Sequence, residues 1–108
     1  MDKKEFTILI IEDEPDISEL IEYNLTQSGY SIIVSNNGEK GIEVARKRLP
    51  DLILLDLMLP GIHGIDVCRI LKSDKDTSDL SIIMLTAPGQ EEDIVKGLET
   101  GADDYVTK

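Results

Sequence analysis

Five short apolar runs recur along the chain, and their pattern constrains the fold more than any other feature. They cover residues 6–11, 30–34, 52–55, 81–85 and 105–107. The longer runs are almost continuous and rich in β-branched residues, which is typical of strands covered on both faces. The sequence therefore predicts a sheet that lies in the interior of an α/β fold.

Segments with helical periodicity separate these runs. Apolar residues recur at helical spacing at Ile17, Leu20, Ile21 and Leu25, at Ile42, Ala45 and Leu49, at Ile65, Cys68 and Leu71, and at Ile94, Val95 and Leu98. Pro15 suits the first turn of a helix, and Gly29, Pro50 and Gly101 suit helix ends. The resulting βαβαβαβαβ order predicts a parallel sheet with right-handed crossovers and helices on both faces.

The last of these strands is followed by no helical pattern, because the sequence ends at Lys108. A fifth helix would be needed to cover the sheet face beside the first helix. We therefore expect residues 1–108 to form one domain that lacks its last helix, with one apolar face of the sheet uncovered.

The length and the net charge of the chain limit the functions that it can have. The 108 residues suit a single domain, and 11 basic against 22 acidic residues give a formal net charge of −11. This balance argues against direct binding of nucleic acid or an anionic membrane. The single cysteine, the absence of a secretory signal and the lack of a membrane-length apolar run predict a cytoplasmic setting.

Polar residues gather where the predicted strands end. Ligands of open parallel sheets bind beyond the carboxyl ends of the strands. The residues at or near those ends are Glu12, Asp13, Asp56, Thr86, Ala87, Tyr105 and Lys108. The sequence thus predicts one site with three carboxylates, a hydroxyl and an ammonium group.

Crowded carboxylates repel one another unless a cation lies between them, and Mg²⁺ prefers oxygen ligands. We expect Asp13 and Asp56 to bind Mg²⁺ directly, Glu12 to act through a water, and the carbonyl of Met58 to complete the site. The alternative explanation for the first acidic pair is that residues 12–15 cap the first helix and complement its dipole. It does not explain an acid that ends an apolar central strand, where burial of a charge is costly.

The remaining polar groups suit a phosphoryl group. Lys108 and the Thr86 hydroxyl can offset charge on its oxygens, and the Ala87 amide can donate to it. Asp56 is then the nucleophile that becomes an acyl phosphate.

These motifs resemble the receiver domain of bacterial two-component response regulators. The resemblance rests on the acidic pair in ILIIEDEPDI, the stretch DLILLDLMLPGIHG, LTA with Thr86, and GADDYVTK. It spans essentially the whole chain and implies a flavodoxin-like, doubly wound five-stranded sheet of order 2-1-3-4-5.

The resemblance also implies a mechanism and partners. Asp56 would accept a phosphoryl group from a histidine kinase phosphohistidine at a Mg²⁺ site of Glu12, Asp13, Asp56 and Met58. Thr86 and Tyr105 would form a coupled switch, and phosphorylation-dependent homodimers are frequent in the family. Pro88, which lacks an amide hydrogen, is expected to alter switching.

Other functions fit less well. A flavin mononucleotide carrier would need a Ser/Thr/Gly-rich loop where this chain has Glu12-Asp13-Glu14-Pro15. A phosphatase with an aspartyl nucleophile would often carry a second Asp at position 58. A degenerate receiver that acts only through protein contacts is the main alternative, and the presence of Asp13, Asp56, Thr86 and Lys108 argues against it. We expect His63 to be a solvent-facing loop residue and Cys68 a core residue.

Overall fold

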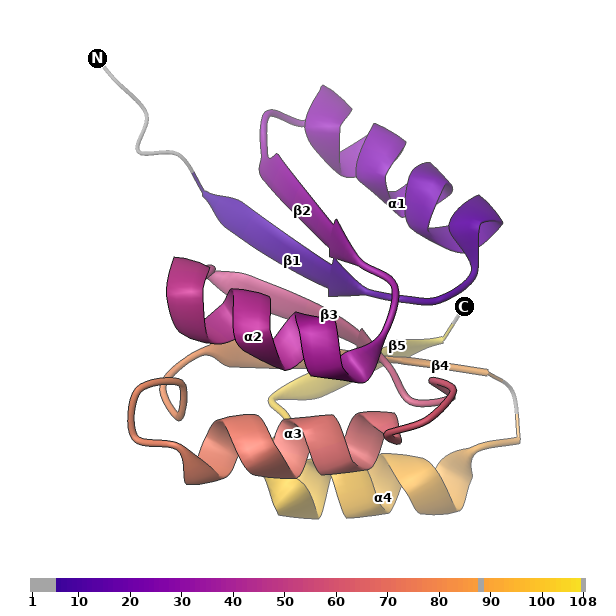
Figure 1. Cartoon of the computed structure of the whole chain (residues 1–108). Coiled ribbons are helices and arrows are strands. Elements are labelled where there is room, and N and C mark those ends of the chain that lie inside the picture. The colour runs from indigo at the N-terminus through magenta and orange to yellow at the C-terminus, as the bar shows by residue number, and fades with distance from the viewer. Residues whose placement is uncertain (1–5, 88, 108) are drawn as a thin grey trace.

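A computed structural model of the chain describes residues 6–87 and 89–107. Five parallel strands form one sheet, in the order β2-β1-β3-β4-β5 (Figure 1). The strands are β1 (Thr7–Ile11), β2 (Ser31–Ser35), β3 (Leu52–Asp56), β4 (Ser81–Thr86) and β5 (Asp104–Thr107). This confirms the predicted sheet and its strand order.

The central strand β1 is covered on both faces, as its continuous apolar sequence predicts. Leu9, Ile10 and Ile11 of β1 have no exposed surface, and neither do Ile53 and Leu55 of β3. Side chains of consecutive strand residues point to opposite faces, so both faces of β1 are buried. The edge strand β5 is exposed along its whole length.

Four helices connect the strands in the described ranges. They are α1 (Pro15–Gln27), α2 (Gly38–Arg48), α3 (Gly64–Ser73) and α4 (Glu91–Thr100). Helices α2, α3 and α4 pack on one face of the sheet, and α1 packs on the other (Figure 1). None of the described helices combines the length and the apolar character that crossing a membrane would require.

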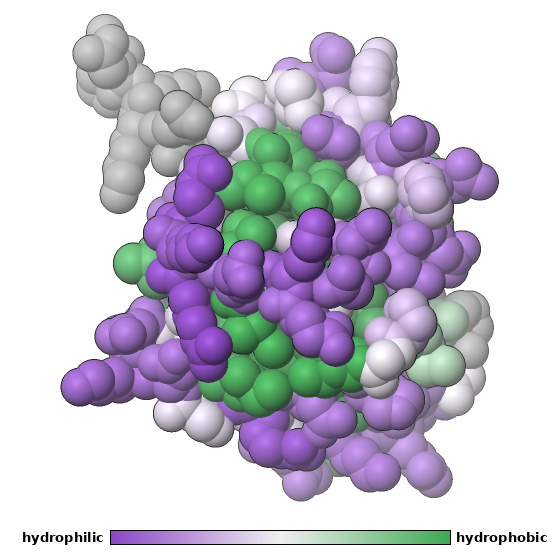
Figure 2. Space-filling view, in the orientation of Figure 1, coloured by the Kyte–Doolittle hydropathy of each residue, from purple (hydrophilic) through white to green (hydrophobic). Residues whose placement is uncertain are grey.

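The main core lies between the sheet and the three-helix layer. Ala45 of α2, and Val67, Cys68 and Leu71 of α3, are completely buried there. Cys68 is thus a core residue, as expected. Figure 2 shows the hydrophobic surface that remains between α2 and α3 on this side of the molecule, flanked by hydrophilic residues.

The prediction that Leu49 belongs to the second helix is wrong. The sequence places Leu49 on the apolar stripe of the second helix, but α2 ends at Arg48, and Leu49 is 53% exposed. Leu49 adopts a left-handed conformation with φ of 45°, and its amide donates to the Ala45 carbonyl. Pro50 disfavours the helical conformation in the residue before it, so the stripe ends one turn early.

The face that carries α1 has an apolar groove beside the helix. The groove has a volume of about 390 Å³, and its lining is almost entirely apolar. Helix α1 contributes Ile17, Leu20, Ile21 and Leu25, and the strands contribute Leu54, Leu85, Val106 and Thr107. The expected uncovered face is therefore present in the described part of the chain.

Candidate phosphoacceptor site

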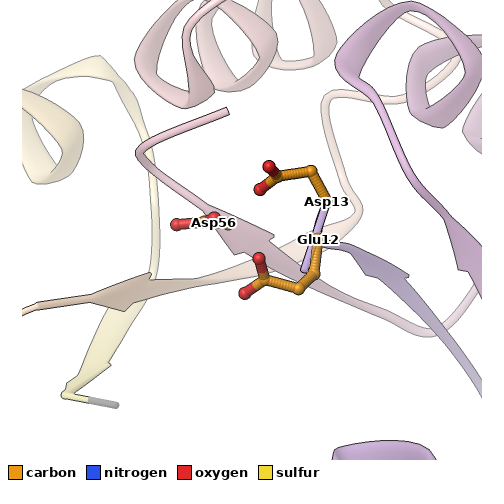
Figure 3. Close-up of side chains that lie close together, drawn as sticks. All are labelled: Glu12, Asp13 and Asp56. Carbon is orange, nitrogen blue, oxygen red and sulfur yellow. The ribbon is translucent and has the colours of Figure 1, made fainter. Parts of the chain in front are cut away.

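Three carboxylates meet at the carboxyl edge of the sheet. Glu12 and Asp13 follow β1, and Asp56 is the last residue of β3. The two strands are neighbours with Ile11 paired to Leu55, so their ends lie together. Ligand oxygens of the three residues lie within 4.8 Å of one another (Figure 3). The sequence prediction that these residues converge is confirmed.

The carboxylates differ in exposure and are oriented by the backbone. Glu12 and Asp56 are each only 1% exposed, whereas Asp13 is partly exposed. The Met58 amide donates to Oδ1 of Asp56 at 3.1 Å, and the Glu14 amide donates to Oε2 of Glu12 at 3.2 Å. Each buried carboxylate is therefore held by an amide two residues further along the chain.

This donor set fits a hard divalent cation. Three carboxylates supply only oxygen ligands, and their mutual repulsion favours a cation among them. Two of them are almost fully removed from water, which increases the cost of leaving their charges uncompensated. Glu12, Asp13 and Asp56 are thus the residues that would hold such an ion, with Asp13 nearest to solvent.

Thr86 lies on the strand next to Asp56. Asp56 pairs with Leu85, and the Leu57 amide donates to the Leu85 carbonyl, so β3 and β4 end side by side. Thr86 is fully buried, and its hydroxyl donates to the Val106 carbonyl at 3.5 Å. Its hydroxyl is therefore directed to β5 in this structure.

Ala87 follows Thr86 directly. Its amide donates to Oε1 of Gln90 at 2.5 Å. Gln90, which is not among the site residues predicted from the sequence, is half-buried and binds a backbone amide of the candidate site. The sequence signal for this contact is that Gln90 follows Ala87 by three residues, close enough for its side chain to reach the amide.

Tyr105 lies in the edge strand β5, where it pairs with Met84 and is 42% exposed. Its side chain thus lies at the surface, and its role as a switch stays a prediction. Lys108 and Pro88 lie outside the described residues, so the roles expected for them are predictions as well. His63 is exposed at the residue before α3, as expected for a loop residue.

Comparison with known proteins decides the family. Residues 8–108 match the response regulator receiver domain. The chain belongs to this family. Receiver domains are signalling phosphoacceptors rather than enzymes with independent turnover, and histidine kinases phosphorylate them. The cluster of Glu12, Asp13 and Asp56 is typical of their phosphoacceptor site.

Individual relatives agree with this assignment. The phosphate regulon transcriptional regulatory protein PhoB of Pseudomonas aeruginosa is 51% identical over 102 residues, which cover 94% of this chain and 44% of PhoB. The receiver domain therefore spans less than half the length of this relative, and the same is true of RpaA from Synechocystis.

Two solved receiver structures are also similar. The receiver domain of the Pseudomonas aeruginosa sensor histidine kinase PA1611, with a magnesium ion coordinated in its active-site cleft, has a TM-score of 0.88 and 30% identity. The alignment covers 97% of this chain and 86% of that one. The BeF₃-activated receiver domain of Klebsiella pneumoniae RstA has a TM-score of 0.86 and 34% identity, with 94% and 85% of the two chains covered. The acidic site described above thus resembles a receiver magnesium site.

Proposed function

We propose that this receiver domain accepts a phosphoryl group from the phosphohistidine of a sensor histidine kinase onto Asp56, in a reaction that requires Mg²⁺. The observation that carries the proposal is the convergence of three carboxylates within 4.8 Å, with Asp56 ending a central strand. The phosphorylated domain then changes conformation and controls a downstream effector.

The transfer exchanges one bond to phosphorus for another. A carboxylate oxygen of Asp56 forms a bond to phosphorus as the P–N bond of phosphohistidine breaks. The electron pair of that bond returns to the imidazole, which takes a proton from water. The Met58 amide, bound to Oδ1, keeps the Asp56 carboxylate in a fixed orientation for this attack.

Charge stabilisation accounts for most of the catalysis in such transfers. When bound, Mg²⁺ would neutralise negative charge shared by the carboxylates and the phosphoryl oxygens. Glu12, Asp13, Asp56 and the Met58 carbonyl are the proposed ligands of the ion. Among this chain's own donors, Lys108 supplies a positive charge.

Thr86 and Ala87 supply neutral donors next to Asp56. We assign the Thr86 hydroxyl and the Ala87 amide to phosphoryl oxygens in the phosphorylated form. Both donors bind other protein groups in this structure, so phosphorylation requires that they exchange partners. Thr86 and Tyr105 are the proposed switch pair, because Thr86 connects β4 to the strand that carries Tyr105.

The relatives support the wider setting of the proposal. The relative PhoB is a transcriptional regulatory protein more than twice as long as the matched region, so an effector would lie outside this domain. The net charge of −11 disfavours direct nucleic-acid contact by the receiver itself. We propose a cytoplasmic setting and homodimer formation upon phosphorylation.

The test is intact-protein mass spectrometry after incubation with acetyl phosphate and Mg²⁺. We expect the mass to increase by one phosphoryl group, and the adduct to be lost in base. Asp56→Asn should show no adduct, whereas Asp79→Asn, which changes an exposed carboxylate outside the cluster, should react like the wild type. A folded wild-type protein whose mass does not change would contradict the proposal.

A further inference from the structure

The Ala87 amide is bound by a side chain from the start of α4. Oε1 of Gln90 accepts its hydrogen at 2.5 Å, which is short for an N–H···O bond. Gln90 directly precedes α4, and its side chain makes no capping bond to the amides of that helix. The side chain is thus used to hold the loop after β4, not to cap α4.

Gln90 is also part of the first turn of α4 through its backbone. Its carbonyl accepts from the Ile94 amide at 3.0 Å. The same residue therefore links the loop after β4 to the helix that follows.

Gln90 and a phosphoryl group on Asp56 would compete for the same amide hydrogen of Ala87. Under that function the Ala87 amide donates to a phosphoryl oxygen on Asp56, and one amide hydrogen makes one strong bond at a time. The Thr86 hydroxyl must also leave its partner, but its bond to the Val106 carbonyl is long, at 3.5 Å, and therefore weak. The bond to Gln90 is the shorter of the two that must be broken.

We propose that Gln90 is a positioning residue that holds the Ala87 amide while Asp56 is unphosphorylated. A phosphoryl oxygen on Asp56 then replaces Oε1 of Gln90, and the start of α4 is released. The exchange is favourable because a charged acceptor binds an amide more strongly than a neutral one. The proposal rests on the proposed function, and it adds a residue that opposes activation.

The sign of the effect distinguishes this role from simple support of the fold. Gln90→Met has similar length and lacks the acceptor, so the Ala87 amide becomes available to a phosphoryl group. Gln90→Glu has a stronger acceptor whose charge also repels the phosphoryl group. A residue that only stabilised the loop would weaken phosphoryl binding in both variants.

The experiment measures beryllofluoride binding, in the presence of Mg²⁺, by the receiver domain. We expect Gln90→Met to bind about fivefold more tightly than the wild type, the factor that corresponds to one net hydrogen bond. Gln90→Glu should bind more weakly than the wild type. Gln27→Met, at the exposed carboxyl end of α1, is the matched control and should bind like the wild type.

A second readout needs no phosphoryl analogue. Hydrogen exchange of the Ala87 amide, followed by NMR, should be faster in Gln90→Met than in the wild type and unchanged in Gln27→Met. Unchanged exchange in Gln90→Met would overturn the inference. So would equal or weaker beryllofluoride binding by a folded Gln90→Met, even if the wild type binds. A wild type that neither binds beryllofluoride nor accepts a phosphoryl group would instead overturn the proposed function, and the exchange result would still report on the bond to Gln90.

Discussion

Gly64, the first residue of α3, lies directly against the backbone carbonyl of Asp56. A Cβ atom at position 64 would collide with that oxygen and would lie 2.6 Å from the Cα of Leu57. The Gly64 amide also donates to the Leu57 carbonyl at 3.2 Å. The loop after β3 thus folds back on the residue that we propose as the phosphoacceptor, and a side chain at position 64 would prevent this.

We predict that Gly64→Ala destabilises the receiver domain and slows phosphorylation of Asp56. The clash is with backbone atoms, which cannot move aside independently, so the loop and Asp56 must shift together. Overpacking of this kind typically costs about 1–3 kcal/mol. Denaturant unfolding measures the stability, and the rate of mass increase with acetyl phosphate measures the reaction.

Gly97→Ala is the matched control for this prediction. A Cβ atom there would meet the sulfur of Met84, the flexible end of a side chain, on the α4 face of the sheet. Gly97→Ala should therefore reduce stability while leaving the reaction rate of the folded protein nearly unchanged. Equal phosphorylation rates for Gly64→Ala and the wild type would show that the close approach at position 64 does not position Asp56.

The acidic cluster gives a prediction about metal affinity. Asp13→Asn removes a ligand and a negative charge, so the affinity for Mg²⁺ should fall at least about tenfold. Even the loss of a residue that only supports a metal ligand typically lowers metal affinity about 10- to 100-fold. Asp16→Asn makes the same chemical change on the exposed first turn of α1 and should have little effect. Calorimetric titration with MgCl₂ measures both, and equal affinities would remove Asp13 from the site.

Cys68 gives a prediction about reactivity. Its side chain is completely buried against the sheet, and burial raises the pKa of the thiol. A thiol reagent should therefore react with the folded receiver at least about a hundredfold more slowly than with the unfolded chain. Fast labelling of the folded protein would contradict this placement.

The same pKa shift has a defined effect on stability. The folded protein retains the Cys68 proton to higher pH than the unfolded chain, whose thiol has a pKa of about 8.5. The stability that Cys68 contributes is fully present below that value and is lost as pH rises towards the folded pKa. The difference in unfolding free energy between the wild type and Cys68→Ala should therefore shrink above about pH 8.5, as denaturant unfolding can show.

The apolar groove beside α1 leads to a prediction about a longer chain. Continuing the sequence past residue 108 with an amphipathic helix should raise the melting temperature, because the helix can bury the groove. Leu20→Gln, in the groove, should reduce this gain, whereas Val95→Gln, exposed on α4, should not. An unchanged melting temperature upon extension would contradict the idea that the groove is completed by a following helix.

Much of the fold could be predicted because the relevant signals are local. The continuous apolar run of β1 and the turn residues around α1 specify element types without knowledge of the partners. Leu49 shows the limit of this reasoning. Its spacing fits a helix, but the conformational restriction by Pro50 ends α2 before it, and one residue then changes from buried to exposed.

The candidate site was predictable to the extent that it depends on strand ends. Glu12, Asp13 and Asp56 follow directly from the positions of β1 and β3, and the order of the strands brings them together. Gln90 was not predictable in this way. Its contact with Ala87 depends on side-chain conformation and on the path of the loop, which no local periodicity encodes.

Periodicity and parallel pairing were therefore enough to predict the order of the elements, the parallel sheet and the carboxylates at its edge. The amide that binds Asp56, the side chain that binds the Ala87 amide and the need for glycine at position 64 become visible only in the folded protein. Those features depend on contacts between residues on different elements, and close packing makes such contacts sensitive to shifts of a few tenths of an ångström.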